Sequence, residues 1–256
     1  FIKNMTYFVR YNKESEFTKI ISNFCDLRVI WGGDKTIEDI RKCNLNVMSR
    51  DITFPDRHSF SLINNQKFNK LNDSEIKNLA KNFFTDGFFV DQNACSSPHI
   101  IFWVGKNNKT KINKFWKYVY EIKITNYDLP QKGLLEKFLL YSEDTIENKI
   151  NVPNNNYIIN FNLKKLPLDI SHLRGKWGYF YEYNLKKIDL ITNLISKKTQ
   201  TITYFGFESK FLFDIFFKNN VRRIDRIVPI GRAHLMKHIW DGYDFIGQFS
   251  RRVNIE

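Results

Sequence analysis

One cysteine of this sequence lies where a substrate could reach a nucleophile. Cys95 stands in a polar loop of small residues, between a helix predicted to end near Thr85 and a strand predicted to begin at His99. A thiolate is a strong nucleophile, and nearby backbone N–H groups can stabilise it or a developing oxyanion. Cys25 and Cys43 lie on apolar faces, where cysteine behaves as a small hydrophobic side chain. Position alone leaves two interpretations of Cys95 open, a catalytic thiol and an ordinary loop residue.

The cysteines as a group exclude other kinds of site. The three form no CxxC pair and have no metal-ligand spacing with the five histidines. We therefore expect no disulfide framework, no structural zinc and no other metal. Free thiols favour a reducing compartment, so we expect a cytoplasmic protein.

A turn between a predicted strand and a predicted helix has the composition of a phosphate-binding turn. Gly32 and Gly33 let the backbone turn tightly, and the helix that begins at Asp34 offers free N–H groups and the positive end of its dipole. The same composition also occurs in ordinary connections between a strand and a helix. Both interpretations stay open at this point.

The C-terminal part contains a histidine with three candidate roles. His234 could act as an acid, contact a substrate or be an ordinary surface histidine. Asp241 and Gly242 form a turn signal, and Trp240 beside them could simply pack.

Strand and helix patterns alternate along the chain and define the elements that must position these residues. Apolar patterns predict strands at 6–11, 26–31, 59–63, 99–104, 157–163, 177–183, 200–205 and 225–230. Amphipathic patterns and capping residues predict helices at 16–24, 34–43, 72–85, 109–124, 131–148, 185–196 and 208–218. The alternation predicts an α/β fold with largely parallel sheets.

Composition and charge narrow the class of protein. The 256 residues, 43% hydrophobic and 16% aromatic, suffice for one large domain or two small ones. Neither a transmembrane run nor a signal peptide is visible. The net charge of +13 fits a surface for nucleic acid or an anionic membrane, a basic groove for the phosphates of a dinucleotide or coenzyme A, or simply an AT-rich gene. Scattered lysines and the lack of a nucleic-acid motif favour the last, so we expect no nucleic-acid partner.

In their order and spacing, these segments resemble the acyl-CoA reductase family typified by the fatty-acid reductase of bacterial bioluminescence, a branch of the aldehyde dehydrogenase superfamily. The resemblance is carried by VIWGGDKTIEDIR (29–41), FPDRHSFSLI (54–63), FFVDQNACSSPHIIFW (88–103), KKTQTIT (197–203), RIDRIVPIGRAH (223–234) and WDGYDFI (240–246). It covers most of the chain and is weakest between residues 105 and 165. It implies an aldehyde dehydrogenase-like fold, with a three-layer α/β catalytic domain and a partial Rossmann-type nucleotide-binding domain.

The resemblance implies roles for residues of the active site. Cys95 corresponds to the nucleophile of the superfamily, inside a Gln-x-x-Cys loop whose glutamine is Gln92. Ser96 and His234 are assigned, with Gln92, to the substrate or active-site loop.

A nicotinamide cofactor, NADPH or NADH, is also implied. Gly32 and Gly33 correspond to a turn near the phosphates and nicotinamide of the cofactor. Gly178 corresponds to a turn, and Trp177 before it to an aromatic residue that contacts the cofactor.

One departure from the superfamily bears on the reaction. Members that hydrolyse their acyl-enzyme carry a glutamate base in the stretch that corresponds to residues 54–59, and no glutamate stands there in register. Asp56 and His58 are the alternative bases, but we expect structural roles for both. A thioester that is to be reduced is better kept from water, so this absence favours a reductase.

The activity implied is NAD(P)H-dependent reduction of a long-chain acyl-CoA or acyl-thioester to the aldehyde through a cysteine acyl-enzyme. The acyl donor is acyl-CoA or an acyl-protein, with an acyl-protein synthetase as a candidate partner, and the full-length protein is expected to be a homo-oligomer. Three alternatives stay open: a short-chain CoA-acylating aldehyde dehydrogenase, an inactive truncated structural paralogue, and a basic nucleic-acid-binding module.

The resemblance also predicts the domain organisation. Residues 1–54 are predicted to be the second half of a dinucleotide-binding domain, 55–235 the catalytic domain, and 236–256 a segment that returns toward the nucleotide-binding domain. The family has about as much chain again before the position of Phe1, and the sequence begins there without Met, in the middle of an apparent strand. The sequence is therefore expected to be the C-terminal portion of a longer protein.

Overall fold

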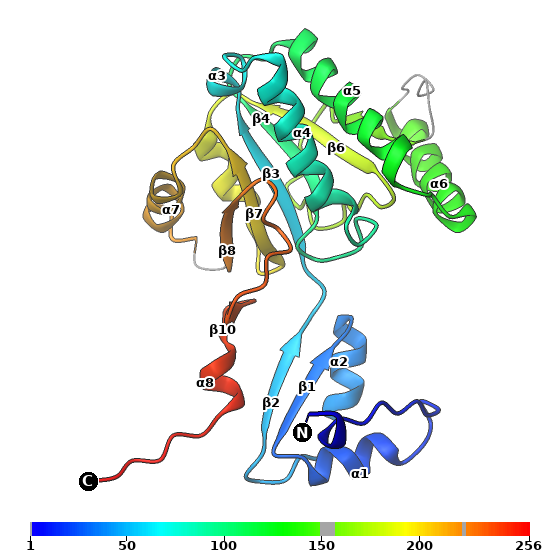
Figure 1. Ribbon diagram of the computed structural model, residues 1–256, viewed down its shortest axis with the longest axis vertical. Coiled ribbons are helices and arrows are strands. Elements are labelled where there is room, and N and C mark those ends of the chain that lie inside the picture. Colours follow the sequence, from blue (N-terminus) through cyan, green and yellow to red (C-terminus); the bar gives the residue numbers. More distant parts are fainter. Residues whose placement is uncertain (1, 149–156, 222–223) are drawn as a thin grey trace. The chain divides into compact units, whose positions relative to one another are not determined.

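The computed structural model describes residues 2–148, 157–221 and 224–256, which divide into two compact units (Figure 1). The first unit consists of the residues up to Asp56 together with Phe249–Glu256, and the second of Arg57–Gln248. The domain boundaries expected after residues 54 and 235 stay a prediction. Arg223, which opens one of the motifs above, lies outside the described residues.

The first unit is built around two parallel strands. Its elements are η1 (Ile2–Met5, a 3-10 helix), α1 (Phe17–Phe24), β1 (Leu27–Trp31), α2 (Asp34–Arg41) and β2 (Arg50–Phe54). Leu27 lies opposite Arg50 in the parallel ladder. The alternating side chains Ile52 and Phe54 of β2 are buried with Ile30 of β1, which gives the unit its small core.

The second unit contains the remaining elements. They are β3 (His58–Asn64), α3 (Asn65–Phe68), α4 (Asp73–Phe88), β4 (Pro98–Val104), α5 (Lys109–Asn126), α6 (Gln131–Asn148), β5 (Ile159–Asn162), β6 (Tyr179–Leu185), η2 (Ile188–Leu194), β7 (Thr199–Phe205), α7 (Ser209–Lys218), β8 (Arg226–Pro229), β9 (Ile239–Trp240), β10 (Tyr243–Asp244) and α8 (Phe245–Phe249), whose last residue is assigned to the first unit. The predicted capping box is present at α4, where Asn72 and Glu75 bond to each other's backbone N–H groups.

Six strands of this unit form one sheet in the order β5-β6-β4-β3-β7-β8. Every neighbouring pair is parallel, so all six strands begin along the same edge of the sheet. The central strand β3 is bulged between Ser59 and Phe60. This arrangement confirms the predicted α/β class with a parallel sheet.

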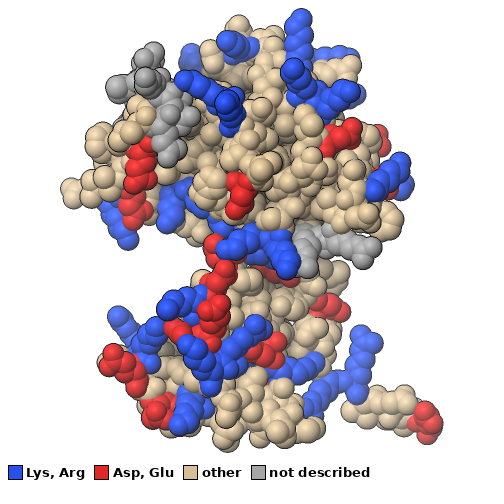
Figure 2. Space-filling view, turned by 180° about the vertical axis from the view of Figure 1, so that it is seen from behind, with Lys and Arg blue, Asp and Glu red and all other residues tan. Residues whose placement is uncertain are grey.

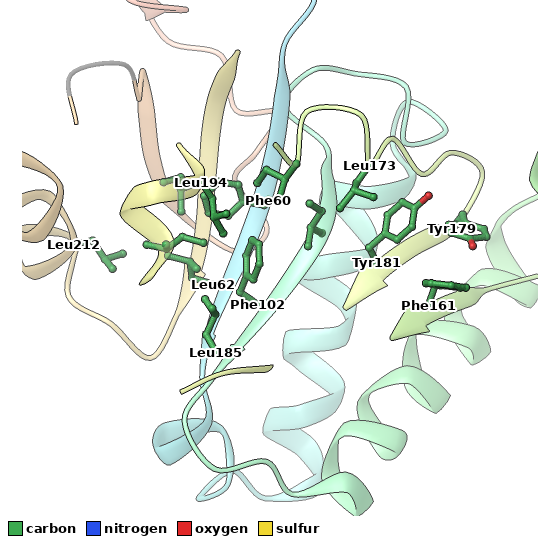
Figure 3. Packing of buried hydrophobic residues seen from close by; sticks show 14 of the residues in the cluster. Phe60, Leu62, Phe102, Phe161, Leu173, Tyr179, Tyr181, Leu185, Leu194 and Leu212 are labelled. Carbon is green, nitrogen blue, oxygen red and sulfur yellow. The ribbon is translucent and has the colours of Figure 1, made fainter. Parts of the chain in front are cut away.

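Helices cover both faces of the sheet and make it three-layered (Figure 1). Side chains of α4 and α5, such as Phe83 and Phe115, pack with Ile101 and Trp103 of β4 on one face. On the other face, α6, η2 and α7 cover the cluster in Figure 3, which includes Phe60, Leu62, Phe102, Tyr179, Tyr181, Leu194 and Leu212. Because both faces are buried, β3 and β4 are buried almost throughout, and β4 contains a continuous apolar run from Ile100 to Val104, as is usual for parallel strands.

Two predicted elements are wrong. Residues 6–11 form no strand, and Phe8 within them is 97% exposed, because apolar alternation makes a strand only where another strand accepts its hydrogen bonds. The helix predicted at 185–196 is the 3-10 helix η2. Its apolar residues Ile188, Ile191 and Leu194 recur every third position, which is the period of a 3-10 helix.

The surface shows no single basic stripe on the face in view. Figure 2 shows lysine and arginine side chains distributed over that face and interspersed with acidic ones. Within the described residues, no helix has both the length and the apolar character needed to cross a membrane. Nor do three or more His, Cys, Asp or Glu side chains gather there as metal ligands would.

Candidate active site

The residues singled out in the second unit gather at the edge of the sheet where its strands begin. Cys95 lies three residues before β4, Gly178 directly before β6, and Ser59 is the second residue of β3. Ligands of open parallel sheets more commonly bind at the opposite, carboxyl edge. The candidate site is therefore made by the loops that lead into the strands.

The Cys95 loop is compact and ordered by its own backbone. Asp91 and Gln92 have positive φ angles of 52° and 60°, which turn the chain sharply after α4. Asn93 N–H then donates to Val90 C=O at 2.7 Å. Cys95 itself is half-buried, as are the other two cysteines.

Gln92 clamps this loop to the start of β6. Its side chain is fully buried, and its Nε2 donates to Pro98 C=O at 3.2 Å and to Tyr179 C=O at 2.8 Å. Its Oε1 accepts the N–H of Gly178 at 3.0 Å. Every polar atom of the amide is thus engaged, so Gln92 supports the loop and presents no group to a substrate.

Ser59 holds the backbone of the candidate nucleophile. Its Oγ–H donates to Cys95 C=O at 2.6 Å, and its Oγ accepts the N–H of Thr201 on β7 at 3.0 Å. Ser59 is the second residue of β3, so its hydroxyl lies near the edge of the sheet, beside an irregularity in the register of β3 with β4. Sequence reasoning missed Ser59, although it lies inside the 54–63 motif.

His234 contacts the residues that follow Cys95. Its Nε2–H donates to Asp86 C=O at 2.8 Å, since a carbonyl can only accept, and this leaves Nδ1 to accept from Ser96 Oγ–H at 3.2 Å. Ser97 Oγ lies 3.3 Å from Nε2, and the ring packs on Phe89. Burial lowers the pKa of His234, so the ring is neutral at neutral pH.

Asp86 anchors the segment that contains His234. Its carboxylate accepts the N–H groups of Gly231 at 2.6 Å and Ala233 at 2.8 Å. Burial raises the pKa of Asp86 to about 7, and these two bonds act in the opposite direction. Sequence reasoning also missed Asp86, because an aspartate near the end of a polar helix is usually solvated.

Trp177 and Gly178 form a tight turn before β6, with positive φ angles of 59° and 89°. The Trp177 indole donates to Glu136 Oε2 at 2.7 Å and lies against Gly133, both on α6. The ring is therefore docked on the helix within the second unit. Its predicted contact with a cofactor stays a prediction.

The two histidines at the starts of β3 and β4 are buried and neutral. Burial, aided by the Arg174 guanidinium, lowers the pKa of His58 to about 4 and that of His99 to about 3. His99 Nδ1–H donates to Gly175 C=O at 2.7 Å, and His58 Nε2 lies 3.4 Å from Thr199 Oγ1. His58 is only 1% exposed, which argues against its acting on a water molecule from solvent.

The Gly32–Gly33 turn belongs to the first unit, where it joins β1 to α2. Gly33 is the N-cap of α2 and has no side chain to cap the helix. A Cβ at Gly33 would meet nothing within 4 Å, whereas one at Gly32 would lie 3.1 Å from Thr36. The space and the N-terminal position at a helix suit a phosphate, and the acidic Asp34 in the first turn opposes it.

The second unit thus brings together Cys95, Gln92, Ser96, His234, Trp177 and Gly178, while their roles in a site stay a prediction. The side chains and backbone of this arrangement can themselves support one kind of chemistry. It presents a half-buried thiol on a fixed backbone, with neutral hydrogen-bond donors and acceptors around it. That combination suits nucleophilic attack on a carbonyl carbon and retention of the resulting thioester.

Solved structures with a similar fold are aldehyde dehydrogenases and related reductases. An acetylating aldehyde dehydrogenase from Geobacillus thermoglucosidasius matches with a TM-score of 0.51 at 11% identity, over 85% of this chain and 50% of that one. A propionaldehyde dehydrogenase from Rhodopseudomonas palustris, with bound CoA and an acylated cysteine, matches with a TM-score of 0.51 at 12% identity, over 86% and 50%. An engineered glycolyl-CoA reductase with bound NADP+ gives 0.53 at 12%, over 87% and 51%. The predicted aldehyde dehydrogenase-like fold is confirmed, and the chain spans about half the length of these structures.

Residues 5–127 match the model of the acyl-CoA reductase (LuxC) family. The matched stretch contains both the Gly32–Gly33 turn and the Cys95 loop. The predicted resemblance to that family is therefore confirmed over this part of the chain. No curated protein sequence matches the chain.

Proposed function

We propose that this chain is the catalytic portion of an acyl-CoA reductase, in which Cys95 carries the acyl group as a thioester. The observation that supports this most strongly is the family match over residues 5–127, because it contains Cys95. The hydrogen bonds that Ser59 and Gln92 make to the loop around Cys95 add physical support. They hold the backbone of the thiol without occupying its sulfur.

The first half-reaction transfers the acyl group to the protein. The Cys95 thiolate attacks the carbonyl carbon of the donor thioester, a new C–S bond forms, and the C–S bond to CoA breaks. The CoA thiolate leaves and takes up a proton. The oxyanion that develops meanwhile is stabilised by backbone N–H groups, among which we assign that of Cys95. The bond from Ser59 to Cys95 C=O fixes the orientation of the Cys95 backbone.

The second half-reaction releases the aldehyde. A bound reduced nicotinamide supplies the hydride. When the acyl carbon has gained it, the thioester has become the anion of a thiohemiacetal on Cys95. Its C–S bond breaks, and the products are the free aldehyde and the Cys95 thiolate, ready for another acyl group.

We assign the cofactor's phosphates to the Gly32–Gly33 turn, because the N-terminus of α2 is open there. The first unit is then the nucleotide-binding part of the protein and residues 55–235 the catalytic part. The cofactor is NADPH or NADH.

Protection from water is the feature that separates this reaction from hydrolysis. A base that activates water near Cys95 would discharge the thioester as free acid. His58, the one candidate base of the second unit in the corresponding stretch, is buried with its pKa lowered to about 4. We therefore propose that the acyl-enzyme is long-lived until hydride reaches it.

We further propose that the acyl group is long-chain and that its donor is acyl-CoA or an acyl-protein, in a cytoplasmic homo-oligomer. A second candidate is a short-chain CoA-acylating aldehyde dehydrogenase. Labelling with radioactive acyl-CoA of two to sixteen carbons distinguishes the two by the chain length that acylates Cys95 fastest.

The experiment that tests the function follows the label on the protein. Radiolabelled acyl-CoA without a cofactor should leave a label on Cys95 that decays slowly in water, and addition of NADPH or NADH should release it as aldehyde. Cys95→Ala should never be labelled. Rapid release of free fatty acid without a cofactor, or labelling of Cys95→Ala, would refute the proposal.

A further inference from the structure

Two lysines are buried together beside the turn that precedes β6. Lys123 of α5 is 0% exposed and Lys137 of α6 is 1% exposed. Their amino groups converge on the same two carbonyl oxygens. Lys123 Nζ donates to Tyr157 C=O and, at 3.1 Å, to Trp177 C=O, while Lys137 Nζ donates to the same groups at 2.9 Å and 3.2 Å.

Such a pair is unusual, because burying an ammonium group away from water is costly unless strong partners compensate. Here the compensation comes from the two carbonyls and from aromatic rings, since Lys123 Nζ lies 4.9 Å from the ring centre of Phe88 and 5.1 Å from that of Tyr127. Burial lowers the pKa of Lys123 to about 6 and that of Lys137 to about 8. Each of the two lysines is therefore less readily protonated than a solvent-exposed one.

The carbonyl that the lysines hold belongs to a peptide group with a second partner. Trp177 C=O and Gly178 N–H are the two ends of one peptide plane. The lysines bind its oxygen, and Gln92 Oε1 accepts its N–H at 3.0 Å. Because a peptide group is planar and rigid, fixing its oxygen also aims its N–H. The lysine pair therefore acts on Gln92 through this one peptide.

Gln92 connects the fixed Trp177–Gly178 peptide group to the loop of the candidate nucleophile, Cys95. Its Nε2 donates to Tyr179 C=O on β6, which holds Gln92 itself at the beginning of the segment that contains Cys95. The same Nε2 donates to Pro98 C=O, at the end of that segment. A Cβ at Gly178 would lie 2.9 Å from Lys123 Nζ, so no side chain fits between the lysines and the peptide they hold.

We infer that Lys123 and Lys137 are positioning residues for Cys95, acting through the Trp177–Gly178 peptide and Gln92. The inference rests on the proposed function only in treating Cys95 as the nucleophile. A pair with a merely structural role would contribute to the stability of the unit without controlling the order of the Cys95 loop in particular.

Hydrogen exchange tests this directly in the protein, without any substrate. Lys137→Met should increase exchange in a peptide that covers residues 89–97 by about threefold or more, which is a modest energetic coupling. Gln92→Met should do the same, and the double variant should show less than the product of the two effects. Lys117→Met, on the exposed surface of α5, is the matched control and should leave this peptide unchanged.

Two outcomes would overturn the inference. One is unchanged exchange of residues 89–97 in a folded Lys137→Met, and the other is a double variant whose effects simply multiply. If Lys137→Met does not fold, Lys123→Gln keeps a donor at the same place and is judged by the same two criteria. A failure of the proposed function is detected by a different measurement. The unsubstituted protein would then not be labelled by acyl-CoA, whatever its hydrogen-exchange pattern.

Discussion

Ser59 Oγ donates a hydrogen bond to the carbonyl oxygen of Cys95 at 2.6 Å. Two residues along the same strand, Ser61 makes a bond of the same length and a similar kind, to Thr203 Oγ1. Both serines are fully buried and both join β3 to β7, but only Ser59 also donates to the Cys95 loop, whereas the hydroxyl of Ser61 bonds to Thr203. The pair offers a comparison in which burial and residue type are matched.

We expect Ser59→Ala to lower the rate of Cys95 acylation by about ten- to a hundredfold, since a misplacement of about 1 Å at a reacting group can cost that much. Ser61→Ala should leave the rate close to that of the unsubstituted protein. Each change should lower the free energy of unfolding by about 1–3 kcal/mol, because each leaves a buried partner unpaired. Urea unfolding and acyl-CoA labelling measure the two effects. Equal rates for the two variants would contradict a positioning role for Ser59.

His234 should matter in its neutral form. Protonation places a hydrogen on Nδ1, which then no longer accepts from Ser96 Oγ–H. Because burial holds the pKa of His234 below 6.5, the bond is present at neutral pH and is lost as the pH falls through that lowered pKa. We expect His234→Ala to slow Cys95 acylation at pH 7.5 and to flatten the acidic limb of its pH profile. The exposed His238→Ala is the control, and a profile unchanged in His234→Ala would rule the role out.

The buried histidines predict a dependence of stability on pH. His58 and His99 are neutral in the folded protein down to about pH 4 and 3, whereas in the unfolded chain they protonate near 6.5. The unfolded state therefore binds more protons below 6.5. As the pH is lowered below 6.5, the free energy of unfolding should therefore decrease, by up to about 1.4 kcal/mol per pH unit for each histidine.

The substitution His99→Asn isolates one of these contributions. An asparagine amide can still donate to Gly175 C=O, as His99 Nδ1–H does, but it does not titrate. Its unfolding curves between pH 6.5 and 4.5 should show a shallower slope than those of the unsubstituted protein. The exposed His172→Asn should keep the original slope. A slope unchanged in His99→Asn would show that this histidine is not neutral in the folded state.

The two glycines before α2 should respond differently to a methyl group. Gly33→Ala is expected to fold normally, because its Cβ projects into open space at a φ of −66°. If the cofactor's phosphates lie at this turn, the same methyl group should weaken the binding of NADPH or NADH about tenfold or more, as the loss of backbone contacts to a charged group would. Fluorescence titration measures the affinity and a thermal melt the fold. Unchanged affinity in a folded Gly33→Ala would remove the turn from the cofactor site.

Much of the fold could be predicted because the second unit obeys local rules. The run at 99–104 is apolar enough to be buried on both faces, the segment at 59–63 carries Phe60, Leu62 and Ile63, and Asn72 with Glu75 marks the beginning of α4. The strand β2 was missed, although the alternation of Ile52 and Phe54 was its signal. These features depend on residues that are close together in the sequence, so they can be recognised in a single sequence.

The supports of the candidate site could not be predicted in the same way. Ser59 bonds to Cys95 across 36 positions of the sequence, beside an irregularity in the register of β3 that the sequence does not indicate. Lys123 and Lys137 look like surface residues in a chain with 40 basic side chains, and only the packing of α5 and α6 reveals that they are buried. The resemblance named the thiol, whereas its supports depend on contacts between distant segments.

The bond from Thr201 N–H to Ser59 Oγ joins residues that are 142 positions apart. A ribosome that adds about 5–20 residues per second needs roughly 7–28 s to pass from one to the other. For the later part of that interval, once residue 95 has been added, Cys95 has been synthesised while the strand that completes its support has not. A nascent chain thus contains the thiol before the hydrogen bonds that fix its backbone can all form.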